Sequence, residues 1–473
     1  MSGVALERRI ANFRAARAAG PAIELEAAVR RARLSRDASA RLAAAVGGEV
    51  VAGIGGRYVR IDASPRSMPV DRARLADLPD QPAAGVRLIC LDTETTGLAT
   101  AAGTIAFLVG LGWWNGDDFQ TAQLLLPDHA DEPALLAALG DLLPPDAWLV
   151  TYNGRGFDWP LLTTRYRMHL RAPPAHDGHL DLLPLVRRIF RHRLPDARLR
   201  TVESHLLGIH RLHDVEGWEI PGRYLDVLRG GPADLLGEVV RHNAEDVRSL
   251  GRLVAYLALA LGDRASWPSA PAGDLAGLAR AYRLSGRLED ALTCLDIALA
   301  ARPTNSSSAL EARAAAVHED PDPDAAWWRG AVDYPAGLAR RPVIEPTRVG
   351  DAWTEQRVLV ERAHLLRRLS RHADAEAAWI SAAAGPGRLA ALAWVEVAKL
   401  RERRLGDLAG ALAAGERART AAERRRRLGL PEPRLELAIA TRLARLRRRI
   451  APTITPAPRT RDPLGAAMGH GSE

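Results

Sequence analysis

Several residue types are scarce in this sequence, and each shortage argues against a class of protein. Two cysteines, Cys90 and Cys294, occur in 473 residues and in no metal-ligand spacing, which argues against a disulfide framework and against a cysteine zinc site. No run of about 18 uncharged apolar residues is present, and no apolar segment follows the charges of the N-terminus. Membrane and secretory interpretations therefore fail, and we expect a cytoplasmic protein.

Lysine is almost absent, although the chain is basic. Lys399 is the single lysine among 65 basic residues, whereas alanine, arginine and leucine abound. The net charge of +8 suits a polyanionic partner such as nucleic acid. A compositional bias of the genome would produce the same excess of arginine, so charge alone does not identify a nucleic-acid-binding protein.

The length and the mixed composition predict a globular chain of two or three domains. Residues 1–80 predict Ala-rich helices followed by a β-hairpin. Residues 85–265 alternate apolar strands with helices, beginning with three strands in meander order, which is typical of an α/β domain. Residues 273–449 carry helical patterns, and the Pro- and Gly-rich residues 451–473 are expected to be disordered.

The helical part contains a pattern typical of tetratricopeptide repeats, in which small residues let two helices pack closely. A second, degenerate copy and a looser third copy follow, which predicts a short repeat array. The first copy comprises Ala279, Tyr282, Gly286, Ala291, Leu295, Ala298 and Pro303, and the second comprises Ala363, Ala375, Trp379 and Ala382.

Two acidic residues at the end of the first strand of the α/β region suggest a metal site. Asp92 and Glu94 are two residues apart, so a strand directs both carboxylates to one face of the sheet. Carboxylate oxygens are ligands that Mg²⁺ and Mn²⁺ prefer, and Gly97 lets the backbone approach a ligand closely. The alternative is a pair of carboxylates that cap the following turn.

Two later motifs add further polar side chains. Asn153 and Asp158 lie where a strand gives way to a helix, and Asp158 could simply be the N-cap of that helix. His242 and Asp246 are four residues apart in a helical pattern and share one face, which could equally be a solvated surface. Three such motifs in this order are nevertheless hard to obtain by accident.

The sequence resembles the DEDD exonucleases, and within them the YprB-type predicted ribonuclease H-like exonucleases, over roughly residues 86–262. The resemblance implies a ribonuclease H-like, mixed-sheet α/β domain followed by α-helical tetratricopeptide-like repeats. The stretches that carry it are LDTETTGL, GTIAFLVGLGWW, EPALLAAL, LVTYNGRGFDWPLL, HLDLLPLVRR, GWEIPGRYLDVLRGG and HNAEDV.

This resemblance implies a 3′→5′ exonuclease that binds two divalent cations, Mg²⁺ or Mn²⁺, with His242 as the general base. The metal-binding acids would be Asp92, Glu94, Asp158 and Asp246. His242 stands four residues before Asp246, the spacing usual for the tyrosine subclass, whereas most histidine-type members have a five-residue offset. The YprB-type motif shares the shorter spacing, so His242 is retained as the base.

Family position also implies contacts with the 3′-terminal nucleotide, through Thr95, Gly97, Leu98, Asn153 and Phe157. Three further groups have simpler interpretations. We expect Asp181 to be a helix N-cap. His169, His176 and His179 are expected to lie in a loop and to bind no zinc ion. The arginine runs Arg424–Arg427 and Arg447–Arg449 are expected to be solvated helix faces, with phosphate contact as the alternative.

The resemblance leaves the substrate and the partners open. Single-stranded DNA ends, in repair or processing, are the favoured substrate. An exoribonuclease of the same fold is the alternative, because the motifs do not determine the sugar. A non-catalytic repeat scaffold that binds nucleic acid ends is a third interpretation. The repeats are expected to bind a protein partner such as a helicase.

Overall fold

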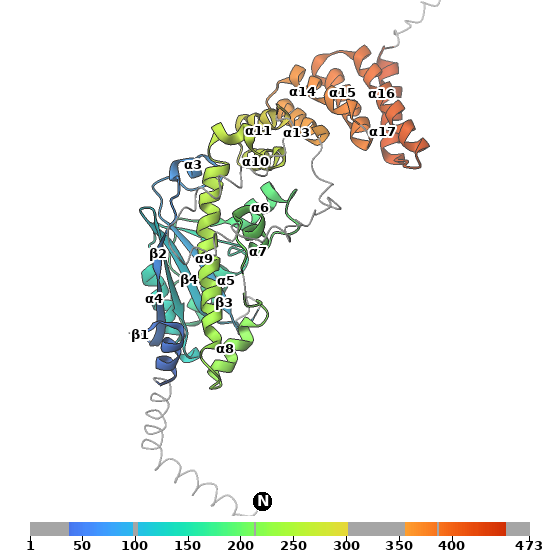
Figure 1. Cartoon of the computed structure of the whole chain (residues 1–473). Coiled ribbons are helices and arrows are strands. Elements are labelled where there is room, and N and C mark those ends of the chain that lie inside the picture. The colour runs from blue at the N-terminus through green and yellow to red at the C-terminus, as the bar shows by residue number, and fades with distance from the viewer. Residues whose placement is uncertain (1–36, 98–102, 212–213, 301–354, 386, 451–473) are drawn as a thin grey trace, which may run out of the picture. The chain divides into compact units, whose positions relative to one another are not determined.

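The computed structural model describes most of the chain as two compact units, which divide between Trp353 and Thr354 (Figure 1). The described residues are 37–97, 103–211, 214–300, 355–385 and 387–450. Parts of the sequence-based predictions lie outside them, namely most of the N-terminal helical segment, Leu98, Pro303 and residues 451–473.

A seven-stranded mixed sheet forms the base of the first unit. Its strands β3, β4 and β5 form the predicted meander. The predicted hairpin, β1 with β2, pairs with β5 and therefore extends the same sheet. Strands β6 and β7 run parallel to β3. The spatial order is β1 (Glu49–Gly53), β2 (Gly56–Ser67), β5 (Asp118–Leu125), β4 (Ala106–Asn115), β3 (Leu88–Thr95), β6 (Trp148–Thr151) and β7 (Gly178–Asp181).

The helices of the first unit connect these strands, cover them or follow the last of them. They are α3 (Arg72–Asp77), η1 (His129–Asp131), α4 (Glu132–Leu142), α5 (Asp158–Met168), α6 (Leu182–Phe190), α7 (Leu199–Val202), η2 (Glu203–Leu207), α8 (Ile220–Leu228), α9 (Leu235–Ala260), η3 (Arg264–Ser269), α10 (Ala272–Leu284) and α11 (Leu288–Ala300).

The long helix α9 crosses one face of the sheet over β3, β4 and β5, and α4 packs on the other face (Figure 1). Two glycines of β4 let α9 approach closely. A Cβ added at Gly110 would lie 2.3 Å from Oδ1 of Asn243, and one at Gly112 would lie 2.6 Å from Cγ1 of Val247. Because any side chain at these two positions would push α9 away, the glycines determine how close its polar residues come to β3.

Two aspartates at the starts of helices behave differently. Asp181 caps α6, because its side chain accepts a hydrogen bond from the backbone N–H of Leu183. Asp131 occupies the N-cap position of α4, but its side chain makes no capping hydrogen bond there. Its carboxylate instead accepts a hydrogen bond from the backbone N–H of Arg57 at 3.1 Å, since the β1–β2 turn packs against it.

Helices α10 and α11 pack together where the first repeat is predicted, and α10 also packs against α6 of the same unit. Asp274 of α10 forms an ion pair with Arg193 at 2.8 Å. Gly277 lies so close to α6 that an added Cβ would be 2.4 Å from Cα of Ile189. Gly286 in the turn has a φ of 82°, which favours glycine. The first unit therefore includes this hairpin, which the sequence analysis assigned to the repeat part.

The second unit consists of helices, each of which packs against the next one along the chain. Small residues at the predicted close-packing positions, Ala363, Ala375 and Ala382, are fully buried. The sheet domain and these helices confirm the predicted fold class. No helix in the described part of the chain is long and apolar enough to cross a membrane. The helices are α13 (Glu355–Arg368), α14 (His372–Ala384), α15 (Gly387–Leu400), η6 (Arg401–Leu405), α16 (Leu408–Arg427) and α17 (Pro433–Ile450).

Candidate active site

The last residues of β3 present the two acids to helix α9. Asp92 is paired with Gly110 and Glu94 with Leu108 on the neighbouring strand β4, and this is the sheet face that α9 covers. Both acids are half-buried, and the residue between them, Thr93, is buried. The strand therefore directs both carboxylates to one face.

Asp158 reaches the same end of the sheet from the start of α5. This helix follows β6, the parallel neighbour of β3, so both strands end at one edge. The hydroxyl of Thr93 donates to Oδ1 of Asp158 at 2.5 Å. Phe157 occupies the N-cap position of α5, so the interpretation of Asp158 as a simple N-cap is wrong.

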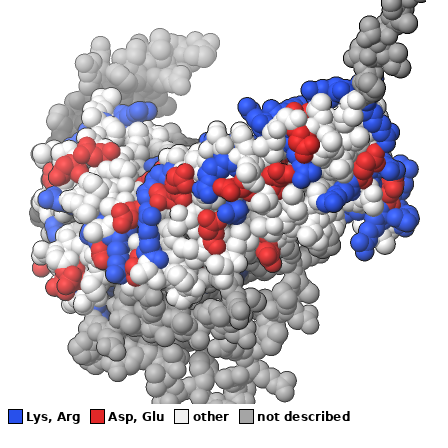
Figure 2. Space-filling view, turned by 90° about the horizontal axis from the view of Figure 1, so that it is seen from above, with Lys and Arg blue, Asp and Glu red and all other residues white. Residues whose placement is uncertain are grey.

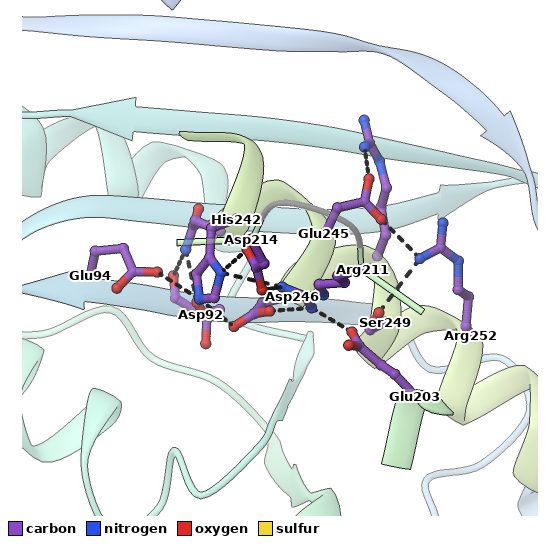
Figure 3. A network of polar contacts seen from close by, with 12 residues as sticks. Asp92, Glu94, Glu203, Arg211, Asp214, His242, Glu245, Asp246, Ser249 and Arg252 are labelled. Carbon is purple, nitrogen blue, oxygen red and sulfur yellow. Dashed lines mark hydrogen bonds and ion pairs between the residues drawn. The ribbon is translucent and has the colours of Figure 1, made fainter. Parts of the chain in front are cut away.

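Helix α9 supplies His242 and Asp246 from the facing side (Figure 3). Nε2 of His242 lies 4.0 Å from Oε1 of Glu94 and 3.7 Å from Oδ2 of Asp246. The two side chains are 17% and 18% exposed, respectively, so the interpretation of this face as a solvated surface is wrong. All five residues singled out from the sequence thus meet at one end of the sheet.

A buried amide network positions Asp92. Nδ2 of Asn243 donates to Oδ2 of Asp92 at 2.8 Å. Nε2 of Gln123 donates to Oδ1 of Asn243 at 2.8 Å and to the carbonyl of Val240, also at 2.8 Å. Because Gln123 requires an oxygen at that place, the orientation of the Asn243 amide is determined. Neither amide was predicted from the sequence, although Asn243 lies inside the His-Asn-Ala-Glu-Asp motif.

Three acids of the site, Asp92, Glu94 and Asp158, have pKa values above their ordinary ones. Burial, then the negative charges of Asp246 and Glu94, raise the pKa of Asp92 well above its usual value. Burial raises the pKa of Glu94 to about 8, and burial likewise raises the pKa of Asp158 to about 6. These carboxylates lie in one poorly solvated place, where their ionised forms are disfavoured.

His242 is oriented by an acid that the sequence analysis did not single out. Its Nδ1 lies 2.7 Å from Oδ1 of Asp214. Burial alone would lower the pKa of His242, but this hydrogen bond and the charges of Asp246 and Glu94 outweigh burial and raise it to about 9. Asp214 lies in an irregular segment between η2 and α8, where no periodicity connects it with α9.

A buried arginine, Arg211, joins the same network (Figure 3). Its guanidinium forms ion pairs with Asp246 and with the fully buried Glu203, and it lies 3.4 Å from Oδ2 of Asp214. Its side chain is 7% exposed. Arg211 thus compensates one acid of the site and one structural acid at the end of α7. It was not among the predicted site residues either.

The donor set fits a hard divalent cation. Within the described residues, no three Asp, Glu, His or Cys side chains converge into a ready-made metal site. Each acid has a protein partner instead, such as Arg211 for Asp246 and Asn243 for Asp92. The raised pKa of Asp92 and of Glu94 nevertheless means that their charged forms lack compensation. Carboxylate oxygens are the ligands through which Mg²⁺ or Mn²⁺ would supply it.

Comparisons with known proteins agree with this geometry. Residues 89–258 match the family model described as the RNase_H superfamily. This region is a ribonuclease H-like domain. The chain is also 39% identical over 172 residues to the uncharacterized protein YprB of Bacillus subtilis (strain 168), which covers 36% of this chain and 41% of the relative. The chain thus matches about two fifths of that relative's length.

In this ribonuclease H-like domain, two of the residues predicted to contact a nucleotide, Thr95 and Phe157, are adjacent in the chain to Glu94 and Asp158, and Leu98 lies outside the described residues. The hydroxyl of Thr95 donates to the carbonyl of Gly97 at 2.6 Å, so it holds the turn after β3. Asn153 is exposed and adopts a φ of 70°, and its backbone N–H donates to Asp181 at 2.8 Å. Phe157 is half-buried beside Asp158. Their contacts with a nucleotide stay predictions.

The three histidines predicted to lie in a loop have separate partners, and His179 belongs to strand β7. His169 forms an ion pair with Glu132 at 2.6 Å, and His179 hydrogen bonds with Thr151 at 2.8 Å. His176 packs edge-on against a tryptophan ring.

Proposed function

We propose that this protein is a metal-dependent 3′→5′ exonuclease of the DEDD type that acts on single-stranded DNA ends in repair or processing. The observation that carries the proposal is the meeting of four acids and His242 from β3, α5 and α9 at one end of a ribonuclease H-like sheet. The acids are Asp92, Glu94, Asp158 and Asp246.

The four acids would hold two Mg²⁺ or Mn²⁺ ions. When bound, such ions stabilise the attacking and leaving oxygens of an in-line phosphodiester displacement. The protein positions the acids beforehand: Asn243 holds Oδ2 of Asp92, and Thr93 holds Oδ1 of Asp158. Fixed donors of this kind reduce the reorganisation that the site needs when substrate arrives.

His242 would accept the proton of the attacking water at Nε2. This nitrogen faces Glu94 and Asp246, while Nδ1 is engaged by Asp214. After proton transfer the imidazolium is stabilised by the carboxylate of Asp214. Arg211 neutralises Oδ1 of Asp246 and leaves Oδ2 toward His242. The short spacing of His242 and Asp246 on α9 therefore still places the imidazole next to Glu94.

The helices after the nuclease domain would form tetratricopeptide-like repeats that bind a protein partner, such as a helicase. Buried alanines between paired helices support a repeat array. Pull-down of a partner by the full chain, lost when residues 355–450 are deleted, would test this.

Polarity-resolved digestion tests the function. Single strands of DNA and RNA with matched sequence are labelled at the 5′ or the 3′ end and incubated with Mg²⁺ or Mn²⁺. We expect stepwise shortening of 5′-labelled DNA from its 3′ end, abolished by EDTA and by Asp158→Asn. Faster shortening of RNA would favour the exoribonuclease. No hydrolysis of any strand, together with retained binding of strand ends, would favour the non-catalytic scaffold.

A further inference from the structure

The positive charge of the protein is concentrated in the second unit. Residues 355–450 contain 22 of the 65 basic residues and 11 of the 57 acidic residues, which gives a net charge of +11. The whole chain carries +8, so the remainder carries −3. Basic side chains accordingly predominate over acidic ones on these helices in the face shown in Figure 2. The part of the chain that holds the carboxylate site therefore has little charge of its own with which to attract a polyanion.

Many arginines of the second unit form ion pairs with acids of the same unit. Glu402, which is buried, accepts ion pairs from Arg442, Arg445 and Arg449 at 2.7, 2.5 and 2.8 Å. Within the predicted solvated runs, Arg425 and Arg426 pair with glutamates at the start of α17, and Arg447 pairs with Glu416 of α16. These contacts join neighbouring helices, so those side chains are not free for a ligand.

One cavity differs from this pattern. It has a volume of about 420 Å³ and lies where the ends of α13 and α15 meet the start of α14. Glu396 is the single acid in its lining, and it pairs with Lys399 at 2.6 Å and with Arg367 at 3.2 Å. The lining residues are Arg367, Arg368, Ser370, His372, Trp379, Glu396, Lys399, Leu400, Arg403 and Arg404.

Three arginines of this cavity are left without an acid. Arg368, Arg403 and Arg404 are exposed and form no ion pair within the described part of the chain. Their guanidinium groups come from the end of α13 and from η6, and they repel one another across the cavity. Trp379 and Leu400, the apolar lining residues, are 2% and 4% exposed, so the cavity offers an apolar ligand little surface. The positive charge of these three arginines therefore favours an anionic ligand.

We propose that this cavity binds phosphate groups of the nucleic acid strand, and this inference rests on the proposed function. Guanidinium groups bind phosphate oxygens through paired hydrogen bonds, and they do so without reading the base. Nucleic acid is favoured over an acidic peptide because it is the proposed substrate of the carboxylate site. The part of the chain that holds this site has a net charge of −3, so the cavity would supply the positive charge that the strand needs. Two linked sites on one strand would also raise its overall affinity.

Fluorescence anisotropy with a labelled single strand of about 20 nucleotides tests the proposal. The full chain carries Asp92→Asn to prevent hydrolysis, and the test variant adds Arg403→Ala with Arg404→Ala. The matched control adds Arg434→Ala with Arg448→Ala, which removes the same charge from exposed arginines that lie outside the cavity. We expect the test variant to bind about tenfold more weakly. The slope of log affinity against log salt concentration should become shallower by the equivalent of about one to two phosphate contacts. The control is expected to change affinity less than threefold.

Equal weakening by the test and control variants would overturn the proposal, because general charge would then explain the binding. Binding of labelled polyglutamate is measured in the same way. If the test variant loses binding of polyglutamate but binds the strand as before, the proposal is overturned in favour of an acidic protein ligand. Hydrolysis by the wild type is measured separately. If hydrolysis is absent and the strand still depends on Arg403 and Arg404, the proposed function fails and the cavity proposal stands. If hydrolysis occurs and the two arginine substitutions do not change binding of the strand, the cavity proposal fails and the proposed function stands. Thermal melts verify that both variants fold.

Discussion

Oδ1 of Asp214 lies 2.7 Å from Nδ1 of His242, and this contact directs the other ring nitrogen toward Glu94 and Asp246. Asp214→Asn should therefore lower kcat by about 10- to 100-fold, the usual effect of removing a group that orients a functional histidine. Metal affinity should change little. Asp226→Asn, at an exposed residue paired with Arg229, is the control.

The pH profile separates positioning from simple structural damage. Asp214 raises the pKa of His242, so its replacement should lower that pKa. Since a general base must be neutral, activity should increase with pH as His242 loses its proton, and the acid limb should move to lower pH in Asp214→Asn. An unmoved limb would mean that Asp214 does not act through His242.

Removal of Arg211 should destabilise the fold rather than only the chemistry. Glu203 is fully buried and would lose its guanidinium partner, and an uncompensated buried charge costs about 3–5 kcal/mol. Urea unfolding of Arg211→Gln should show this loss. The double variant with Glu203→Gln should recover part of it, because the charge is then gone. A wild-type midpoint for Arg211→Gln would contradict the prediction.

Asp92→Asn should abolish hydrolysis without loss of stability. The neutral amide resembles the protonated form that the raised pKa of Asp92 favours, and its oxygen can still accept from Asn243. Thermal melts in EDTA should give an equal or higher Tm than for the wild type. Near-wild-type turnover in Mg²⁺ would show that Asp92 is not a metal ligand.

The metal-free protein should lose stability as the pH rises. The folded-state pKa values of Asp158, Glu94 and His242 are about 6, 8 and 9, against ordinary values of 3.8, 4.5 and 6.5. A raised pKa contributes stability that is fully present below the ordinary value and is lost as the pH passes the folded value. From these three groups, stability should therefore fall between about pH 4 and pH 9.

Divalent cations should oppose this loss. Mg²⁺ competes with protons for the carboxylates, so the increase in Tm that it produces should grow from pH 5 to pH 8. Melts in EDTA and in Mg²⁺ over this range measure the difference, and Asp92→Asn should flatten it. A Tm increase that is constant with pH would mean that Mg²⁺ binds away from these acids.

Gly110→Ala should weaken both stability and activity. The added methyl would lie 2.3 Å from Oδ1 of Asn243 and 2.7 Å from Cγ2 of Val247, so α9 or the amide must move. Such overpacking costs about 1–3 kcal/mol. Gly85→Ala meets no atom within 4 Å and serves as the control. Urea unfolding of both variants, with turnover of the folded protein, measures the effect.

Sequence patterns predicted the elements of the site better than its supporting contacts. Asp92 and Glu94 could be placed on one face because a strand has a period of two, and His242 and Asp246 because a helix repeats every 3.6 residues. Periodicity says nothing of Asp214, which reaches His242 from an irregular segment 28 residues earlier.

Long-range packing was also beyond local patterns. The hairpin β1–β2 had the expected turn, but its pairing with β5 depends on tertiary contacts between residues far apart in the chain. The same is true of α10, whose repeat-like sequence gave no sign that Gly277 lies against the backbone of Ile189. Gln123 looked like an ordinary strand residue, and its role became visible once α9 was placed over β5.

The single lysine of the sequence lies in the basic cavity of the second unit. Reagents that acylate primary amines can therefore modify this chain at one side chain, Lys399, besides its terminal amine. Its ammonium group is paired with Glu396 at 2.6 Å and its side chain remains 36% exposed, so a reagent can reach it. A fluorophore attached there would report on the cavity of the otherwise unmodified protein, without removal of competing lysines elsewhere in the sequence.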